Sequence, residues 1–392
     1  MTGTAPPRRG PRPLLLHLTF AMLRSSISFA GSANWKPASP GLNLDAAVAA
    51  EAAFLRGIRA WRAHPWRRDL PDPPVVWTER GARLLDYGGA GPVVLFVPSL
   101  INRWTVLDLM SGHSMVRWLA ASGVHPLLLD WGPPEPDFSL TDYIAGRLTR
   151  ALSAAATQGD AGRAILAGYC MGGTFATAVA AARPDLVRAL ILLAAPWDFH
   201  AGGGDLPRRI AAGAVSWPKA GGLDVVPVDW LQTLFAVADP DAIAAKFRRF
   251  RAMAQNSEAA RLFVAIEDWL NDGVALGGSV ARECLRDWYG ANLPMAGAWR
   301  IAGLAIDPTG IAMPTLAAVP DRDRIVPPDS ALALARLLPG ATLLRPGGGH
   351  VGMMAGRGAP DALWAPVRDW ILAHGAAPGR PRRPRRGDMA LS

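Results

Sequence analysis

The strongest constraint on this chain is one cysteine, Cys170, that stands between glycines where an apolar run meets an alanine-rich stretch. Residues 164–167 predict a short buried strand, and residues 174–182 predict a helix. A turn that lifts one side chain above a sheet, between a strand and a helix, requires residues without bulk two positions before and two positions after it. Gly168 and Gly172 meet this requirement. The pattern therefore predicts a nucleophile elbow with Cys170 at its tip.

The predicted elbow also favours the reactive form of Cys170. It places the cysteine at the N-terminus of a helix, where the helix dipole and free backbone N–H groups favour a thiolate. Gly173 would let this helix pack closely on the strand before it. The alternative is a buried structural cysteine in a glycine turn, because free cysteines are commonly buried. The pattern Gly-x-Cys-x-Gly-Gly at a strand-to-helix junction favours the nucleophile.

The composition predicts one large domain with an insertion. A chain of 392 residues, 50% of them hydrophobic, can bury a sizeable core. Its two cysteines, Cys170 and Cys284, lie far apart in the sequence. This spacing argues against a disulfide framework and against a metal site, and it favours a reducing, cytoplasmic compartment. Cys284 lies in a stretch typical of an amphipathic helix, so we expect it to be structural.

The formal charge of +9 is concentrated at the two ends of the chain, in the arginines of residues 8–12 and in the tail, residues 376–392. Because the part between is nearly balanced, we expect no nucleic-acid partner. The apolar residues 14–23 are like those of a signal peptide, but Arg24 and the lack of a clear cleavage site favour a helix that packs on the domain or on an apolar surface. The tail has too little apolar content to fold, and we expect it to be disordered.

Apolar runs alternate with helical patterns over most of the chain, which predicts an α/β fold with a doubly wound, mostly parallel sheet. The predicted strands are residues 75–77, 83–87, 93–97, 126–130, 164–167, 190–194, 314–319 and 341–345. The predicted helices include residues 44–66, 140–156, 174–182 and 362–373. The alternation stops in a tryptophan-rich part that predicts an inserted helical lid. The expected division is an N-terminal helical extension (1–70), a core (71–198 and 310–375), the lid (199–309) and the basic tail (376–392).

A thiolate nucleophile requires a base, and the base requires an orienting acid. In folds with this elbow the chain order is nucleophile, acid, base. His350 follows the last predicted strand in a glycine-rich loop, which makes it the expected base; the alternative is a histidine of a surface loop. The candidate acids after the strand at 314–319 are Asp321, Asp323 and Asp329. We expect the other candidate histidines, His113, His125 and His200, to be structural.

Attack on a thioester or ester carbonyl creates an oxyanion that requires hydrogen-bond donors. The residue after the nucleophile, Met171, would supply one backbone N–H. The loop after the strand at 93–97 would supply another, from Leu100 or Ile101.

Several short motifs together resemble the polyhydroxyalkanoate synthase family, in particular its short-chain (class III-like) members. They are Val97-Pro-Ser-Leu-Ile-Asn-Arg103, Leu129-Asp-Trp-Gly132, Leu140-Thr-Asp-Tyr-Ile144, Gly168-Tyr-Cys-Met-Gly-Gly173, Ile325-Val-Pro-Pro328 and Gly348-Gly-His-Val-Gly352. The resemblance covers roughly residues 75–375. One departure is Arg324, at a position where the family usually carries histidine.

The resemblance implies an α/β-hydrolase fold and an acyltransferase that polymerises (R)-3-hydroxyacyl groups from coenzyme A thioesters, without a cofactor. It implies that Cys170 carries the acyl group, that His350 is the base and that Asp323, which precedes the Ile-Val-Pro pattern, is the acid. In this family the acid also assists deprotonation of the incoming 3-hydroxyl. It further implies a polyester chain or granule surface as a partner, and we expect a homodimer, with a second subunit left open.

Two alternatives remain open at this point. The same three residues would suit a thioesterase, an esterase or a polyester depolymerase, in which water accepts the acyl group. A non-catalytic protein of granule or membrane surfaces would use residues 14–23 and the tail as binding elements. The cysteine favours transfer, because thioester exchange to an enzyme thiol is nearly thermoneutral and ester formation then runs downhill. A tryptophan-rich lid would exclude water and favour the same outcome.

Overall fold

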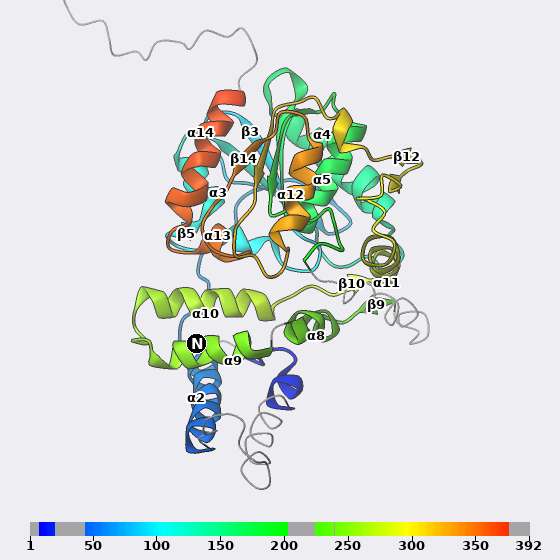
Figure 1. The fold of residues 1–392 in the computed structure, drawn as a ribbon. Coiled ribbons are helices and arrows are strands. Elements are labelled where there is room, and N and C mark those ends of the chain that lie inside the picture. Colours follow the sequence, from blue (N-terminus) through cyan, green and yellow to red (C-terminus); the bar gives the residue numbers. More distant parts are fainter. Residues whose placement is uncertain (1–7, 20–43, 203–223, 239, 376–392) are drawn as a thin grey trace, which may run out of the picture.

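The computed structural model of the chain describes residues 8–19, 44–202, 224–238 and 240–375. Its centre is an eight-stranded sheet with the strand order β1-β2-β6-β3-β7-β8-β13-β14 (Figure 1). The strands are β1 (Val75–Glu79), β2 (Ala82–Asp86), β3 (Val93–Val97), β6 (His125–Asp130), β7 (Ala164–Tyr169), β8 (Val187–Leu193), β13 (Thr315–Ala318) and β14 (Thr342–Leu344). β2 pairs antiparallel with β1 and with β6, and the pairs from β6 to β14 are parallel. The expected α/β fold with a mostly parallel sheet is confirmed, and each of the eight predicted strands lies in this sheet.

Helices cover both faces of the sheet, which is why its central strands are apolar on both sides. Along β3, Leu95 packs on the face covered by α4 (Thr149–Ala156), α5 (Met171–Ala182) and α12 (Pro328–Leu337). Its neighbours Val94 and Phe96 pack on the other face, under α3 (Met115–Ala121) and α14 (Ala365–His374). All five residues of β3 are buried. Successive side chains of a strand point to opposite faces, so a strand buried on both faces has no polar positions.

A mostly helical segment connects β8 to β13 and lies beside one edge of the sheet domain (Figure 1). Its described elements include α8 (Val228–Ala238), α9 (Pro240–Ala252), α10 (Glu258–Asn271), α11 (Gly278–Glu283) and the π-helix η4 (Cys284–Gly290). The segment also holds two small ribbons, β9 (Val225–Val226) with β10 (Leu276–Gly277) and β11 (Arg300–Ile301) with β12 (Leu304–Ala305). Two-residue strands carry no periodic signal, so the sequence did not predict them. Residues 203–223 of the expected lid lie outside the described residues.

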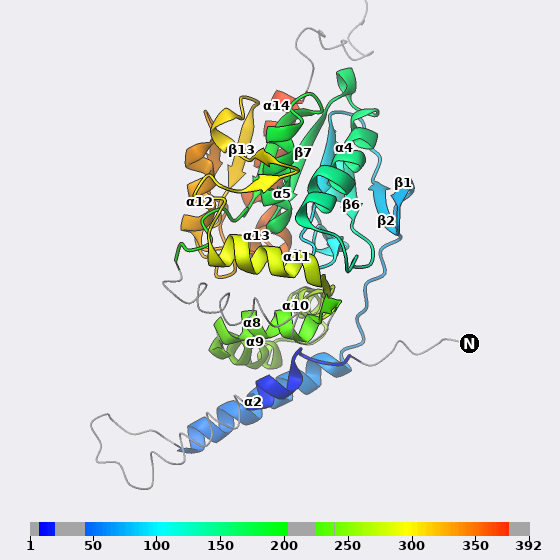
Figure 2. The ribbon, with the colours of Figure 1, turned by 90° about the vertical axis from the view of Figure 1, so that its right-hand side faces the viewer.

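The helix predicted at 44–66 corresponds to α2 (Leu44–Ala63), which packs on α9 of the inserted segment rather than on the sheet (Figure 2). The contact is aromatic: the ring centroid of Phe247 lies 6.2 Å from that of Phe54 and 5.9 Å from that of Trp61. Residues 14–19 are helical, and Leu15 is 79% exposed. Within the described ranges, no helix combines the length and the apolar character that crossing a membrane requires. The tail at 376–392 lies outside the described residues.

Candidate active site

The cysteine of the predicted elbow joins β7 to α5 in a strained backbone conformation. Cys170 has φ 55° and ψ −128°, which a residue with a side chain rarely adopts. Its N–H donates to the carbonyl oxygen of Leu193 at 2.9 Å, and its carbonyl oxygen accepts from Gly173 N–H at 2.8 Å. These two bonds hold the turn, and they fix the thiol at the carboxyl ends of the parallel strands.

The glycines around Cys170 occupy positions where a side chain would not fit. A Cβ added at Gly172 would lie 2.1 Å from the carbonyl oxygen of Val97, and one at Gly168 would lie 2.4 Å from the carbonyl oxygen of Gly172. A Cβ at Gly173 would lie 2.4 Å from the Cβ of Ala195, in the segment after β8. All three glycines thus have the steric role expected from the sequence, because an added Cβ at Gly173 would also lie 3.1 Å from the carbonyl oxygen of Gly168 in β7.

The structure brings Cys170, His350 and Asp323 together from three loops. His350 Nδ1 lies 2.6 Å from Asp323 Oδ2, and the His350 side chain is also hydrogen-bonded to Cys170. The ring of Tyr169 packs against the imidazole of His350, with ring centroids 4.9 Å apart. The Tyr169 hydroxyl donates to the His350 carbonyl oxygen at 3.3 Å. Asp323, His350 and Tyr169 are all buried. This contact network fixes the imidazole between a carboxylate and a thiol.

Only one of the three candidate acids is placed to orient the imidazole. Asp323 is held by two backbone donors, because its Oδ1 accepts from the N–H groups of Ile325 at 2.8 Å and Val326 at 2.9 Å. Asp321 instead pairs with Arg345 at the surface. Asp329 lies exposed in the first turn of α12. The Asp323 carboxylate therefore keeps one oxygen fixed and presents the other to His350.

The pKa of His350 depends on its neighbours. Burial alone would lower this pKa, but the negative charge of a Cys170 thiolate and hydrogen bonds to Asp323 and Cys170 outweigh it and raise the pKa to about 10. The imidazole of His350 therefore holds its proton more tightly than a free histidine does.

The predicted oxyanion donors differ in where they lie. Met171 begins α5, and the first N–H groups of a helix have no partner inside the helix. Ile101 lines the same cavity as Cys170, whereas Leu100 is buried in the core on the α5 face and does not line it. The backbone N–H of Ile101 donates to Ser99 Oγ at 3.4 Å. Ile101 is thus better placed than Leu100, and the roles of Met171 and Ile101 remain predictions.

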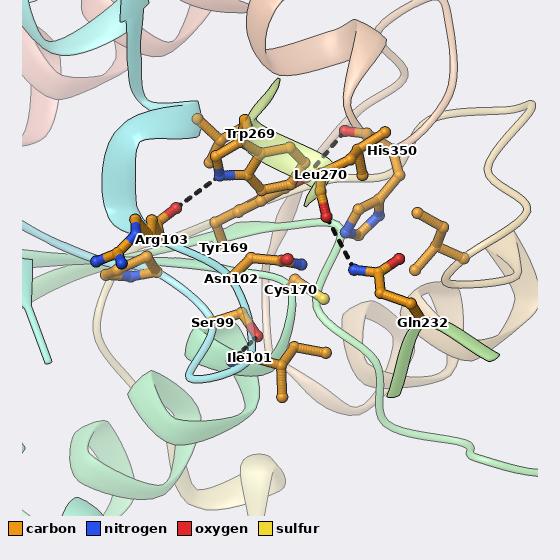
Figure 3. A pocket seen from close by; sticks show the side chains of 13 residues that line it. Ser99, Ile101, Asn102, Arg103, Tyr169, Cys170, Gln232, Trp269, Leu270 and His350 are labelled. Carbon is orange, nitrogen blue, oxygen red and sulfur yellow. Dashed lines mark hydrogen bonds between the residues drawn. The ribbon is translucent and has the colours of Figure 1, made fainter. Parts of the chain in front are cut away.

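A cavity of about 80 Å³ lies over Cys170, between the sheet domain and the inserted helices (Figure 3). Ile101 and Asn102 line it from the loop after β3, Gln232 from α8, and Trp269 and Leu270 from α10. The volume is well below the roughly 300 Å³ or more of ordinary ligand pockets, so these helices leave little room above the thiol.

Sequence reasoning did not assign a role to Asn102, Gln232 or Trp269. Asn102 falls inside one of the motifs quoted above, but a lone asparagine carries no chemistry of its own in a sequence. Gln232 and Trp269 reach the cavity only because the inserted segment folds back over the sheet, and spacing along the chain does not reveal that.

The other titratable candidates lie elsewhere. His113, His125 and His200 bond to Ala355 O, to Asp86 and to Tyr289 O, and none of them lines the cavity. Cys284 is buried in the apolar core, and burial raises the pKa of its thiol. In the part of the chain that the structure describes, no cluster of histidine, cysteine and acidic side chains could hold a metal ion.

Comparison with known proteins gives similarities to a family model, to a solved structure and to curated relatives. A family model described as "alpha/beta hydrolase fold" matches residues 92–219. The structure is also similar to that of MenH from S. aureus, with a TM-score of 0.50 and 16% identity over 76% of this chain and 100% of that one, which bears on the fold alone.

Curated relatives named poly(3-hydroxyalkanoate) polymerase subunit PhaC match a larger part of the chain. The protein from Haloferax mediterranei is 30% identical over 310 residues, 76% of this chain and 63% of the relative. Those from Synechocystis sp. and Allochromatium vinosum are 29% and 27% identical, over 71% and 72% of this chain and 77% and 81% of the relatives. The chain thus spans less than two thirds of the Haloferax protein and about four fifths of the other two.

Proposed function

Because this chain belongs to the PhaC family of poly(3-hydroxyalkanoate) polymerase subunits, we propose that it transfers (R)-3-hydroxyacyl groups from coenzyme A thioesters to a growing polyester. The observation that carries this proposal is the contact between the thiol of Cys170 and the buried imidazole of His350, which is itself held by Asp323. This arrangement has the geometry of a nucleophile with its base and orienting acid.

In the first step, the Cys170 thiolate attacks the thioester carbonyl of the substrate. The backbone N–H groups of Met171 and Ile101 would donate to the oxyanion that forms. The bond between the carbonyl carbon and the coenzyme A sulfur then breaks as the bond to Sγ remains. The leaving thiolate takes the proton from the His350 imidazolium, so that charge and protons balance.

In the second step, the 3-hydroxyl of another hydroxyacyl unit attacks the acyl group on Cys170. His350 accepts the hydroxyl proton, an ester forms, and the Cys170 thiolate leaves. The causes of the His350 pKa support this change of role. Acylation removes the charge of Cys170, which is the largest of the causes that raise that pKa, so the imidazole is a neutral base when the hydroxyl arrives.

We also propose an assembly and a cellular location for this chain. The relatives are named as subunits, so we expect this chain to act with a second subunit, and we expect a homodimer of the catalytic chain. Its expected place in the cell is the surface of polyester granules in the cytoplasm. The inserted helices at 224–309 would act as the lid that keeps water from the acyl-cysteine.

The test is to incubate the purified protein with (R)-3-hydroxybutyryl-CoA and to follow thiol release together with the product. We expect thiol release with recovery of polymer, and neither from Cys170→Ala. Thiol release that yields only free 3-hydroxybutyrate would instead identify a hydrolase. Absence of both with the wild-type protein, also after addition of the second subunit, would refute the proposal.

A further inference from the structure

A buried side-chain oxygen of one residue that lines the cavity over Cys170 has no hydrogen-bond partner among the described residues. The other polar side chains that close it are engaged: Trp269 Nε1 donates to Arg103 O at 2.8 Å, Gln232 Nε2 donates to Leu270 O at 3.0 Å, and Tyr169 donates to His350 O. The side-chain oxygen of Asn102 is buried and accepts no hydrogen bond among the described residues. A buried acceptor without a donor costs free energy, so such an atom in a reaction cavity indicates a group that binds there.

The backbone on both sides of Asn102 is held by the inserted segment. The carbonyl oxygen of Ile101 accepts from Val274 N–H at 3.0 Å, and the carbonyl oxygen of Arg103 accepts from Trp269 Nε1. Arg103 Nε is also 2.6 Å from Asp272 Oδ2. In Figure 3 the amide of Asn102 points toward Cys170, and the amide nitrogen of Gln232 is directed at the carbonyl oxygen of Leu270. Of the two amide oxygens, that of Asn102 is the buried one without a partner among the described residues.

An acyl group bound at Cys170 carries two polar groups near the sulfur. Its carbonyl oxygen accepts hydrogen bonds and suits the backbone donors described above. Its 3-hydroxyl, two carbons further on, is a donor and requires an acceptor close to Cys170. The Asn102 oxygen is such an acceptor, and it is uncharged, so it binds a hydroxyl without removing its proton.

We propose that the side-chain oxygen of Asn102 accepts a hydrogen bond from the 3-hydroxyl of the acyl group and so selects 3-hydroxyacyl over unsubstituted acyl thioesters. This inference rests on the proposed function, because it assumes that Cys170 is acylated by a thioester. An acyl group without the hydroxyl leaves the buried oxygen unpaired, and a site built around a hydroxyl discriminates strongly against an analogue that lacks it.

The test compares the rate of acylation of Cys170 by (R)-3-hydroxybutyryl-CoA and by butyryl-CoA in a single turnover, followed by thiol release and by the mass of the intact protein. We expect the wild-type protein to prefer the hydroxyacyl thioester by about 10- to 100-fold. In Asn102→Leu, which has a similar size and no acceptor, the preference should fall below about threefold, because acylation by the hydroxyacyl thioester slows while acylation by butyryl-CoA does not. Asn102→Ala gives the same comparison if the leucine variant does not fold.

Ser99→Ala is the matched control, because it removes a different polar side chain that lines the same cavity. We expect it to change both rates alike and to keep the preference. Equal slowing of both thioesters in Asn102→Leu would overturn the inference, since the asparagine would then act on a part that both thioesters share. A preference unchanged in Asn102→Leu, or lost in Ser99→Ala, would overturn it as well. If wild-type protein makes polymer but acylates with both thioesters equally fast, this inference fails and the proposed function stands; acylation by neither refutes both.

Discussion

At the scale of single residues, the carboxylate of Asp323 and the thiol of Cys170 act on the same imidazole from two sides. The carboxylate fixes its orientation through a bond of 2.6 Å to Nδ1, which leaves the other ring nitrogen to face the thiol. The glycine pattern selected Cys170 from the sequence, and the chain order of nucleophile, acid and base then selected His350. It did not separate Asp323 from its neighbours Asp321 and Asp329, because three acids in one loop look alike until their hydrogen bonds are known.

The orienting role of Asp323 predicts a large loss of activity in Asp323→Asn. The amide would favour the wrong tautomer of His350, and comparable changes in catalytic triads lower the turnover rate by roughly 10⁴-fold. Thiol release from the hydroxyacyl thioester measures the effect. Asp321→Asn is the control, because that carboxylate pairs with Arg345 at the surface, and its rate should change less than about twofold. Similar losses in both variants would argue that the loop, and not the carboxylate, matters.

The raised pKa of His350 predicts that stability depends on pH between neutral and alkaline solution. A histidine in an unfolded chain loses its proton near pH 6.5. The folded protein keeps the imidazolium until the pH passes about 10. The folded state then binds the extra proton, so its stability falls as the pH rises through this window. The contribution of His350 to stability is fully present below about pH 6.5 and is lost by about pH 10.

We therefore expect the midpoint of thermal unfolding to fall more steeply between about pH 6.5 and pH 10 in the wild-type protein than in Cys170→Ala. The alanine variant lacks the charge that raises the pKa of His350, while its other titrating groups are the same. The difference between the two curves isolates the pair. Parallel curves over this range would contradict an imidazolium stabilised by Cys170.

At the scale of elements, the strands were predictable and the short ribbons of the inserted segment were not. β3 is apolar at every position because helices cover both of its faces, and such a run stands out in a sequence. The elbow was predictable because steric exclusion at Gly168 and Gly172 leaves few other choices of residue. The cavity was not, because its upper wall comes from α8 and α10, whose position over the sheet depends on contacts between distant parts of the chain.

The packing of α5 against the end of β3 predicts that Gly172→Ala is strongly destabilising. The added Cβ would lie 2.1 Å from the carbonyl oxygen of Val97, so the helix or the strand end must move. We expect the free energy of unfolding to fall by about 2–4 kcal/mol, measured by urea denaturation. Gly347→Ala is the control, because no atom lies within 4 Å of its added Cβ, and it should change stability by less than about 0.5 kcal/mol. Equal stability of the two variants would show that the elbow can relax.

At the scale of the whole molecule, the N-terminal residues contact α10, one of the inserted helices that line the active-site cavity. The buried guanidinium of Arg8 donates to the carbonyl oxygen of Trp61 at 3.2 Å and to Asp268 Oδ2 at 2.8 Å. Asp268 also accepts from Trp61 Nε1 at 3.0 Å. It directly precedes Trp269 and Leu270, the two residues of α10 that line the cavity. Arg8 and α2 thus brace the helix that closes the space over Cys170, and no local sequence pattern reveals a bond between residues so far apart.

This connection predicts that Arg8→Ala both destabilises the protein and opens the cavity. Removing the guanidinium takes away the donor to the Oδ2 of the Asp268 carboxylate, which should lower the free energy of unfolding by about 1–3 kcal/mol. Reaction of Cys170 with a bulky thiol reagent should become faster relative to its reaction with iodoacetamide, because α10 is held less firmly. Arg8→Lys should restore little of either property, since one ammonium cannot replace a planar fork that binds several acceptors. Arg357→Ala, an exposed arginine far along the chain, controls for the loss of charge. If stability falls in Arg8→Ala while the ratio of the two labelling rates stays constant, the N-terminal residues stabilise the fold without controlling access to Cys170.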